Sequence, residues 1–217
     1  YGAAEALYYP EYHEYILQYD TQEATQAAYD QLVAEYGKDR CFVDELISSE
    51  DLLMDTASIE PASCYSWGAT LMGLDQLKAQ AGEVLGDSTV TVAVLDTGLD
   101  ATHTFFDHRT ISPDSYNFME NSTDISDVTG HGTHVAGIIS DCTPDNVSFL
   151  ILRVFSLRNV NGEDQEYSTS LVVNTALQYA VEKQADVINM SFGWNDSEAS
   201  SHTFLDEAID AAYQADI

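Results

Sequence analysis

Basic residues are scarce in this chain of 217 residues. Only seven Lys and Arg stand against 37 Asp and Glu, so the formal net charge at pH 7 is −30. A surface of this charge repels the phosphate backbone of nucleic acids and the headgroups of anionic membranes. We therefore exclude nucleic acid as a partner, and we expect a heavily solvated protein that is secreted or held at the cell surface.

Long apolar runs are also absent. No stretch approaches the ~20 apolar residues that a membrane-spanning helix needs, so no membrane span is predicted. Hydrophobic residues nevertheless make up 45% of the chain, which is enough to bury a core and excludes wholesale disorder. Cysteine is limited to Cys41, Cys64 and Cys142, which allow at most one internal disulfide, and their spacing does not choose the pair.

The first 45 residues have the pattern of a small α+β unit. Aromatic and aliphatic residues at 14–19 predict a strand. Asp20 opens a capping-box pattern that predicts the start of a helix, and Gly37 stands where such a helix would end. A second strand is expected to begin at 41–43. Residues 46–63 are polar and without period, which is typical of a linker.

From residue 64 onward, the pattern alternates between buried strands and helices. Val90 to Leu95 is a nearly continuous apolar run, as found in strands that are covered on both faces of a parallel sheet. Two further strands are predicted at 147–155 and 187–190, and helices at 70–81, 131–140, 168–184 and 201–215. This alternation is typical of an α/β fold with a doubly wound, mainly parallel sheet.

Two polar motifs stand at the ends of these predicted elements. Asp96 ends the strand at 90–95, and His131 opens the next predicted helix within Gly-His-Gly-Thr-His-Val-Ala-Gly. The carboxyl ends of parallel strands gather functional groups at one edge of the sheet, so the two side chains are expected to meet there. A neutral imidazole accepts a proton at one nitrogen when a carboxylate orients the other. A third segment, Val187 to Gly193, ends in Ser-Phe-Gly and can pair with an extended peptide.

In this order and spacing, the three segments resemble motifs of the subtilisin-like serine proteases (subtilases). Val94 to Gly98 is similar to the aspartate motif of that family, His131 to Gly137 to its histidine motif, and Val187 to Gly193 to its substrate-binding strand. The resemblance covers about residues 64–217. It implies an α/β catalytic domain and a serine-type endopeptidase, with an Asp-His-Ser triad that acts on polypeptide substrates.

The resemblance also implies a role for each matching residue. Asp96 would orient and support His131, which would act first as general base and then as general acid. The residues implied to bind substrate are Ser191, Phe192 and Gly193 in the cleft, with Phe155 and Tyr167 at an apolar subsite. Asp127, His134 and Asn189 would have structural roles.

The upstream unit resembles the later half of a subtilase propeptide, which inhibits its own enzyme. On this basis residues 1–45 are a partial propeptide domain. Residues 46–63 are a linker with the processing region, and 64–217 are the first part of the catalytic domain. The propeptide tail would then be a partner of the active-site cleft until it is cleaved, as in a zymogen.

Several departures from the family pattern bear on activity. The Gly-Thr-Ser motif of the nucleophile and the oxyanion-hole Asn are both missing from the 217 residues. The chain begins with Tyr rather than Met, and we expect it to be a fragment that is inert by itself. The segment after Gly137 is shorter than the usual calcium loop, so no cofactor is expected, although weak calcium binding at Asp141 and Asp145 stays open.

Three alternatives compete with an active subtilase. Val-Leu-Asp-Thr-Gly also occurs in aspartic proteases, which need two aspartates and an all-β fold. A zinc site could use His131 and His134 with His103 or His108, although a general-base Glu is missing from the motif. A natural truncation could also be a catalytically inactive pseudoprotease with a binding or regulatory role.

Overall fold

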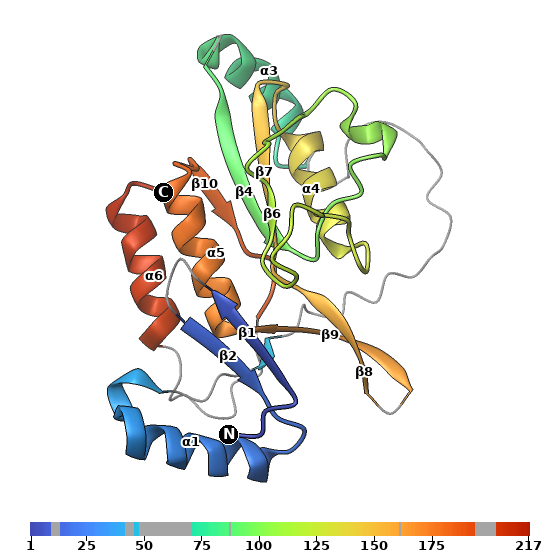
Figure 1. Ribbon diagram of the computed structural model, residues 1–217. Helices are drawn as coiled ribbons and strands as arrows, with labels where there is room; N and C mark the ends of the chain where they lie inside the picture. The colour runs from blue at the N-terminus through green and yellow to red at the C-terminus, as the bar shows by residue number, and fades with distance from the viewer. Residues whose placement is uncertain (10–13, 42–45, 48–70, 87, 161, 194–202) are drawn as a thin grey trace. The chain divides into compact units, whose positions relative to one another are not determined.

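The chain consists of two compact units, Tyr1–Glu45 and Leu46–Ile217. The computed structural model describes residues 1–9, 14–41, 46–47, 71–86, 88–160, 162–193 and 203–217 (Figure 1). Among the helices of these ranges, none has both the length and the apolar character that crossing a membrane requires. We describe each unit by itself.

The first unit contains an antiparallel pair of strands and one long helix. Strand β1 (Glu5–Tyr9) pairs with β2 (Glu14–Gln18), and helix α1 (Gln22–Tyr36) follows, with a short 3₁₀ turn at Lys38–Arg40. The expected strand at 14–19 and the helix ending before Gly37 are confirmed. Strand β1 was not predicted, and the proposed strand at 41–43 falls mostly outside the described residues.

The start of α1 corrects one prediction. Thr21, not Asp20, is the N-cap, because Thr21 has the extended backbone of a cap and its Oγ1 accepts a hydrogen bond of 3.1 Å from the N–H of Ala24. Asp20 lies one residue too early to reach the same group. Two neighbouring residues that both favour the cap position cannot be ranked from sequence alone.

The second unit is built on a parallel sheet. Its strand order is β10 (Val187–Asn189), β4 (Val90–Asp96), β7 (Val147–Arg153) and β5 (Thr110–Ile111), and β6 (Tyr116–Asn117) also pairs with β7. All of these pairings are parallel. The predicted α/β class with a mainly parallel sheet is therefore confirmed, and the all-β fold of an aspartic protease is ruled out.

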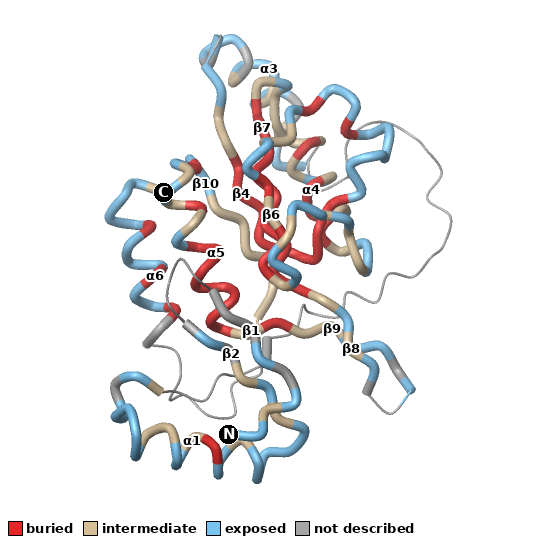
Figure 2. The backbone as a smooth tube through the Cα atoms, viewed as in Figure 1, coloured by how far each residue is buried: buried red, intermediate tan, exposed pale blue. Residues whose placement is uncertain are grey.

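Helices cover both faces of this sheet. The helices are α3 (Leu74–Leu85), α4 (His131–Cys142), α5 (Ser170–Glu182) and α6 (Thr203–Gln214), with a 3₁₀ turn at Thr104–Phe106. Helix α4 lies on one side of the strands, and α5 and α6 lie on the other (Figure 1). Figure 2 shows that burial is concentrated in β4, β7 and the first two turns of α5. The apolar runs predicted this arrangement, because a strand covered on both faces has no polar face.

Side chains of alternate residues in β4 reach opposite faces of the sheet. Val92 and Val94 belong to the cluster that contains Val135 and Ala136 of α4, whereas Ala93 and Leu95 are equally buried but lie outside that cluster. This alternation is the ordinary period of two along a strand.

The predicted helix boundaries needed adjustment. The helix expected at 70–81 runs from Leu74 to Leu85, and Leu77, which was part of the apolar spacing, is 57% exposed. The helix expected from 168 begins at Ser170, because Oγ1 of Thr169 caps it by accepting from the N–H of Val172.

A separate antiparallel sheet was not predicted at all. Strand β8 (Ser156–Val160) forms a hairpin with β9 (Glu163–Thr169), and β3 (Leu46–Ile47) pairs with the end of β9. The strand expected at 147–155 therefore ends at Arg153. Leu46 and Ile47, which were expected in a linker, are strand residues; the remainder of 46–63 lies outside the described ranges.

Candidate active site

A carboxylate and an imidazole meet at the carboxyl edge of the parallel sheet. Asp96 is the last residue of β4 and His131 the first residue of α4, and Oδ1 of Asp96 lies 2.7 Å from Nδ1 of His131. Their side chains are 1% and 11% exposed. Since the N–H of Thr97 also donates to Oδ1 at 2.7 Å, this oxygen is an acceptor, so Nδ1 of His131 is the donor in the contact. In the neutral imidazole, this tautomer leaves the lone pair on Nε2.

Asp96 is almost fully buried. Burial raises the pKa of Asp96 above its usual value, while the hydrogen bonds from His131 and Thr97 oppose this rise. The second oxygen, Oδ2, is buried and has no hydrogen-bond partner among the described residues. The carboxylate is thus oriented through one oxygen, which is the one that faces the imidazole.

Glycines permit the close approach of β4 and α4. Gly98 has a φ of +120°, and a Cβ there would lie 2.6 Å from the carbonyl oxygen of Ile125. A Cβ at Gly132 would lie 2.3 Å from the carbonyl oxygen of Gly98 and 3.1 Å from Cβ of Asp96. These two positions explain why glycine follows both the aspartate and the histidine in the sequence.

Two glycines of the same helix are expected to respond oppositely to substitution. Gly132→Ala should lower the free energy of unfolding by at least about 2 kcal/mol, because its Cβ would overlap the backbone at Gly98. Gly137→Ala is the matched control: no described atom lies within 4 Å of its Cβ, and Ala favours a helix interior by about 0.5–1 kcal/mol. Urea denaturation measures both, and equal effects of the two variants would contradict the close approach.

Asp127 organises the loop before α4. Its Oδ1 accepts from Oγ1 of Thr97 (2.7 Å) and the N–H of Gly130 (2.9 Å), and its Oδ2 accepts from the N–H of Thr133 (2.8 Å). Oγ1 of Thr97 in turn accepts from the N–H of Gly132 at 2.9 Å. Burial alone would raise the pKa of Asp127, but the hydrogen bonds from Thr133 and Thr97 outweigh it and the pKa is lowered.

This network is what positions His131 relative to Asp96. Thr97 and Thr133 are the functional residues that sequence reasoning missed, although both lie inside the motifs around Asp96 and His131. The sequence signal that indicates them is a hydroxyl residue close to Asp96 and another close to His131, since a buried hydroxyl requires a hydrogen-bond partner.

The residues expected to bind substrate follow β10, the neighbour of β4. Oγ of Ser191 donates to Oδ1 of Asn189 at 3.0 Å, and the rings of Phe192 and Phe155 pack edge to face with centroids 5.2 Å apart. Phe155 itself is fully buried, so the ring of Phe192 packs against a residue of the core. The register Asn189↔Val94 brings the segment that follows, Ser191 to Gly193, to the sheet edge where Asp96 lies.

Tyr167 comes from a different element. It lies on β9 opposite Ser156, the residue that follows Phe155, and the guanidinium of Arg158 lies 5.5 Å above its ring.

His134 is exposed and contributes its backbone N–H to the first turn of α4 by donating to the carbonyl of Gly130 at 3.0 Å. No cluster of three His, Cys, Asp or Glu side chains occurs within the described ranges, so the zinc arrangement of His131, His134 and a third histidine is not formed there.

Arg153 is a further polar residue that the apolar pattern of β7 concealed. It is buried, and it donates to the carbonyl oxygens of Phe155 (3.1 Å) and Ser126 (3.3 Å) and to Oε1 of Glu120 (3.1 Å). It therefore joins the end of β7 to the loop that carries Asp127. An Arg at the end of a mostly apolar strand was the available signal.

Known serine proteinases are similar to this chain in sequence. The chain is 32% identical over 137 residues to a thermophilic serine proteinase of Bacillus sp. (strain AK1), covering 59% of this chain and 31% of that protein. It is 29% identical over 161 residues to subtilisin DY of Bacillus licheniformis, covering 72% and 53%. The chain therefore spans only about a third to a half of the length of these relatives.

A solved structure and a family model extend the comparison. Fervidolysin from Fervidobacterium pennivorans, a keratinolytic enzyme related to subtilisin, matches 66% of this chain and 23% of its own with 26% identity and a TM-score of 0.50. The model of the subtilase family matches residues 87–217, which include the whole parallel sheet with Asp96 and His131. Since this match takes in more than half of the residues, the chain belongs to the subtilase family of serine peptidases.

Proposed function

We propose that the protein of which this chain forms part is a serine endopeptidase, with Asp96 and His131 as two members of its triad. The observation that carries this proposal is the 2.7 Å contact between Oδ1 of Asp96 and Nδ1 of His131 at the carboxyl edge of the sheet. A buried carboxylate that fixes the tautomer of an imidazole is the arrangement that general-base catalysis needs.

The two residues have distinct parts in the proposed reaction. Nε2 of His131 takes the proton of a serine hydroxyl as that oxygen attacks the peptide carbonyl, and later gives the proton to the leaving amine. Asp96 keeps the imidazole in the correct tautomer and stabilises the imidazolium by its negative charge. This chemistry uses no metal ion or organic cofactor.

The nucleophile is proposed to lie outside these 217 residues. The Gly-Thr-Ser motif of the family is missing from the chain, and no described serine makes a hydrogen bond to His131. The chain by itself is accordingly proposed to be inert, since residual catalysis without the nucleophile is only about 10³–10⁴-fold over water in the serine protease template.

The proposed substrate is an extended polypeptide. Ser191, Phe192 and Gly193 would pair with its backbone, and Phe192, supported by Phe155, would offer an apolar contact. Tyr167 would contribute from the β9 side. The first unit, residues 1–45, is proposed to be part of an inhibitory propeptide, with its tail within 46–63, and the protein is proposed to be secreted as a zymogen.

A fluorophosphonate probe tests the proposal. We expect stoichiometric labelling of one serine beyond residue 217 in the full-length protein, together with hydrolysis of a denatured protein substrate. The 217-residue chain, treated in parallel, should remain unlabelled. Labelling of the short chain would contradict its inertness, whereas a folded full-length protein that neither reacts nor hydrolyses would be a pseudoprotease.

A further inference from the structure

The second unit contains five basic residues, and four of them are bound by oxygen atoms of the fold. Nζ of Lys78 donates to the carbonyl of Asp141, and Lys183 pairs with Asp114. Arg109 and Arg153 are buried and make several hydrogen bonds each. Arg158 is the exception: it makes no hydrogen bond or ion pair with a described residue, and its Nε is buried without a partner.

The side chain of Arg158 is nevertheless held in place. Its guanidinium lies 5.5 Å above the ring of Tyr167, a cation–π contact across the β8–β9 hairpin. The register pairs Ser156 with Tyr167 and Arg158 with Gln165, so the two side chains are diagonal neighbours on one face of the hairpin. An arginine in such a contact keeps its donors at a defined position.

Two acidic residues of the hairpin lie away from this face. Gln165, directly opposite Arg158, is uncharged. Asp164 and Glu166 alternate with it and therefore lie on the other face, where Oδ1 of Asp164 accepts from the amide of Asn159 at 2.9 Å. No side chain within the described ranges forms an ion pair with Arg158, in a chain of net charge −30.

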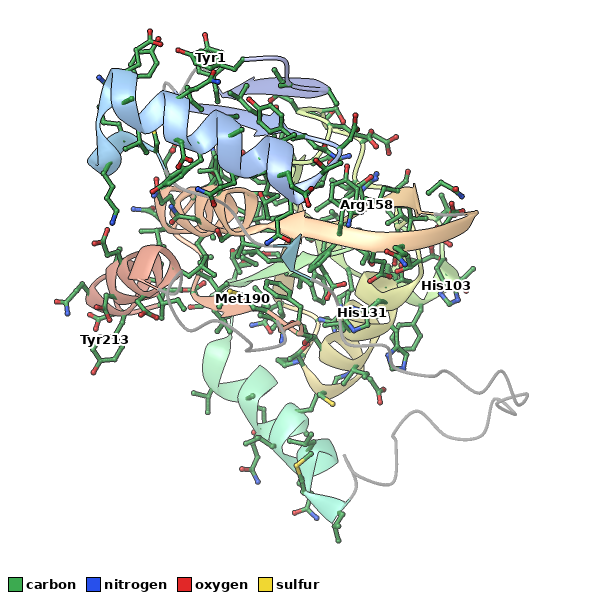
Figure 3. All side chains as sticks on the ribbon, turned by 90° about the horizontal axis from the view of Figure 1, so that it is seen from below. Tyr1, His103, His131, Arg158, Met190 and Tyr213 are labelled. Carbon is green, nitrogen blue, oxygen red and sulfur yellow. The ribbon has the colours of Figure 1, made fainter. Side chains whose placement is uncertain are left out.

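The hairpin starts at the same sheet edge as the Asp96–His131 pair. Arg153 at the end of β7 lies opposite Asp96, and the N–H of Val154 donates to the carbonyl of Asp96 at 2.9 Å. Phe155 then packs under Phe192, and β8 begins with the next residue. Figure 3 shows Arg158 on the hairpin and His131 at the start of α4.

We propose that Arg158 and Tyr167 form a subsite that selects an acidic side chain in the substrate peptide. This inference rests on the proposed peptidase function and specifies its substrate. A planar guanidinium presents two parallel N–H donors that match a carboxylate, and stacking on Tyr167 reduces the ordering cost of that contact. The negative field of the whole surface slows the approach of any acidic peptide, whereas Arg158 distinguishes an acidic from a neutral side chain at one position of the substrate.

A peptide scan on the full-length protein tests this subsite. The substrates are internally quenched neutral peptides that carry a single Glu, or a single Gln as its uncharged counterpart, at each position flanking the cleaved bond. At one position we expect Glu to raise kcat/KM about tenfold over Gln, and Arg158→Gln to bring this ratio to about one. Arg158→Lys, which keeps the charge but loses the planar fork, should retain only part of the preference.

Lys183→Gln is the matched control, because it removes the same charge from a residue that already pairs with Asp114. It should leave the Glu-to-Gln ratio unchanged.

A wild-type protein that cleaves the Glu and Gln peptides at equal rates at every position would overturn the subsite and leave the peptidase function intact. Loss of the preference in Lys183→Gln as well would assign it to net charge, which also refutes a role for Arg158. A wild-type protein that cleaves no peptide refutes the proposed function and this inference with it.

Discussion

Asp96→Asn in the full-length protein is expected to lower kcat about 10⁴-fold with little change in KM. The amide has the size of the carboxylate, but it can offer an N–H to Nδ1 of His131. Nδ1 would then become the acceptor and the proton would move to Nε2, where a lone pair is needed to accept the proton of the nucleophile. Steady-state hydrolysis of a peptide substrate at saturating concentration measures the loss.

The control for this variant is Asp124→Asn. Asp124 is exposed, lies on the loop before α4, and accepts hydrogen bonds from the N–H and Oγ of Ser126. It should change kcat by less than about twofold, since it does not touch His131. If Asp96→Asn retains its melting temperature and loses less than tenfold in kcat, the assignment of Asp96 to the triad is wrong.

Arg109→Ala is expected to lower the free energy of unfolding by about 3 kcal/mol. The guanidinium of Arg109, only 7% exposed, donates to Oγ of Ser140 (2.8 Å) and to the carbonyl oxygens of Ser140, Thr143 (2.8 Å) and Pro144 (2.5 Å). These oxygens converge where α4 ends and turns toward β7. Removal of the side chain leaves them without donors and opens a cavity beside Phe149. Urea denaturation of the full-length protein at neutral pH measures the change.

Two comparisons separate the role of the guanidinium from that of charge. Arg109→Lys keeps the charge but cannot reach four acceptors in one plane, so it should recover less than half of the lost stability. His108→Ala, at the adjacent and half-exposed position, should cost less than about 1 kcal/mol. Full recovery by Lys would show that the positive charge matters and the fork of donors does not.

Parts of the fold that bury apolar residues on a regular period were predictable. Val92 to Leu95 and Phe149 to Leu152 are apolar without interruption, because both faces of the sheet are covered, and the strands that contain them are found where the pattern indicated. The hairpin of β8 and β9 was not predictable in this way. Its residues are largely polar, and it exists because two segments pair with each other, so no continuous apolar face marks it in the sequence.

The candidate site also has a part that was predictable from sequence and a part that was not. The motifs around Asp96 and His131 named the two residues, because glycine and hydroxyl residues at fixed offsets are required for their approach. The burial of Phe155 beneath Phe192 and the stacking of Arg158 on Tyr167 could not be read from spacing. Both depend on how the ends of β7, β9 and β10 converge.

The sequence by itself determined the class of this protein. Its scarcity of basic residues predicts no binding to nucleic acid, its alternating apolar runs determined a parallel sheet covered by helices, and its motifs determined the family. The tertiary structure decided which polar groups have partners. Four of the basic residues in the second unit bind oxygens of the fold, whereas Arg158 stacks on Tyr167 and makes no hydrogen bond to a residue that the structure describes. The reason is physical: hydrophobic periodicity is a local property of the chain, whereas the partner of a polar side chain is set by elements distant in sequence.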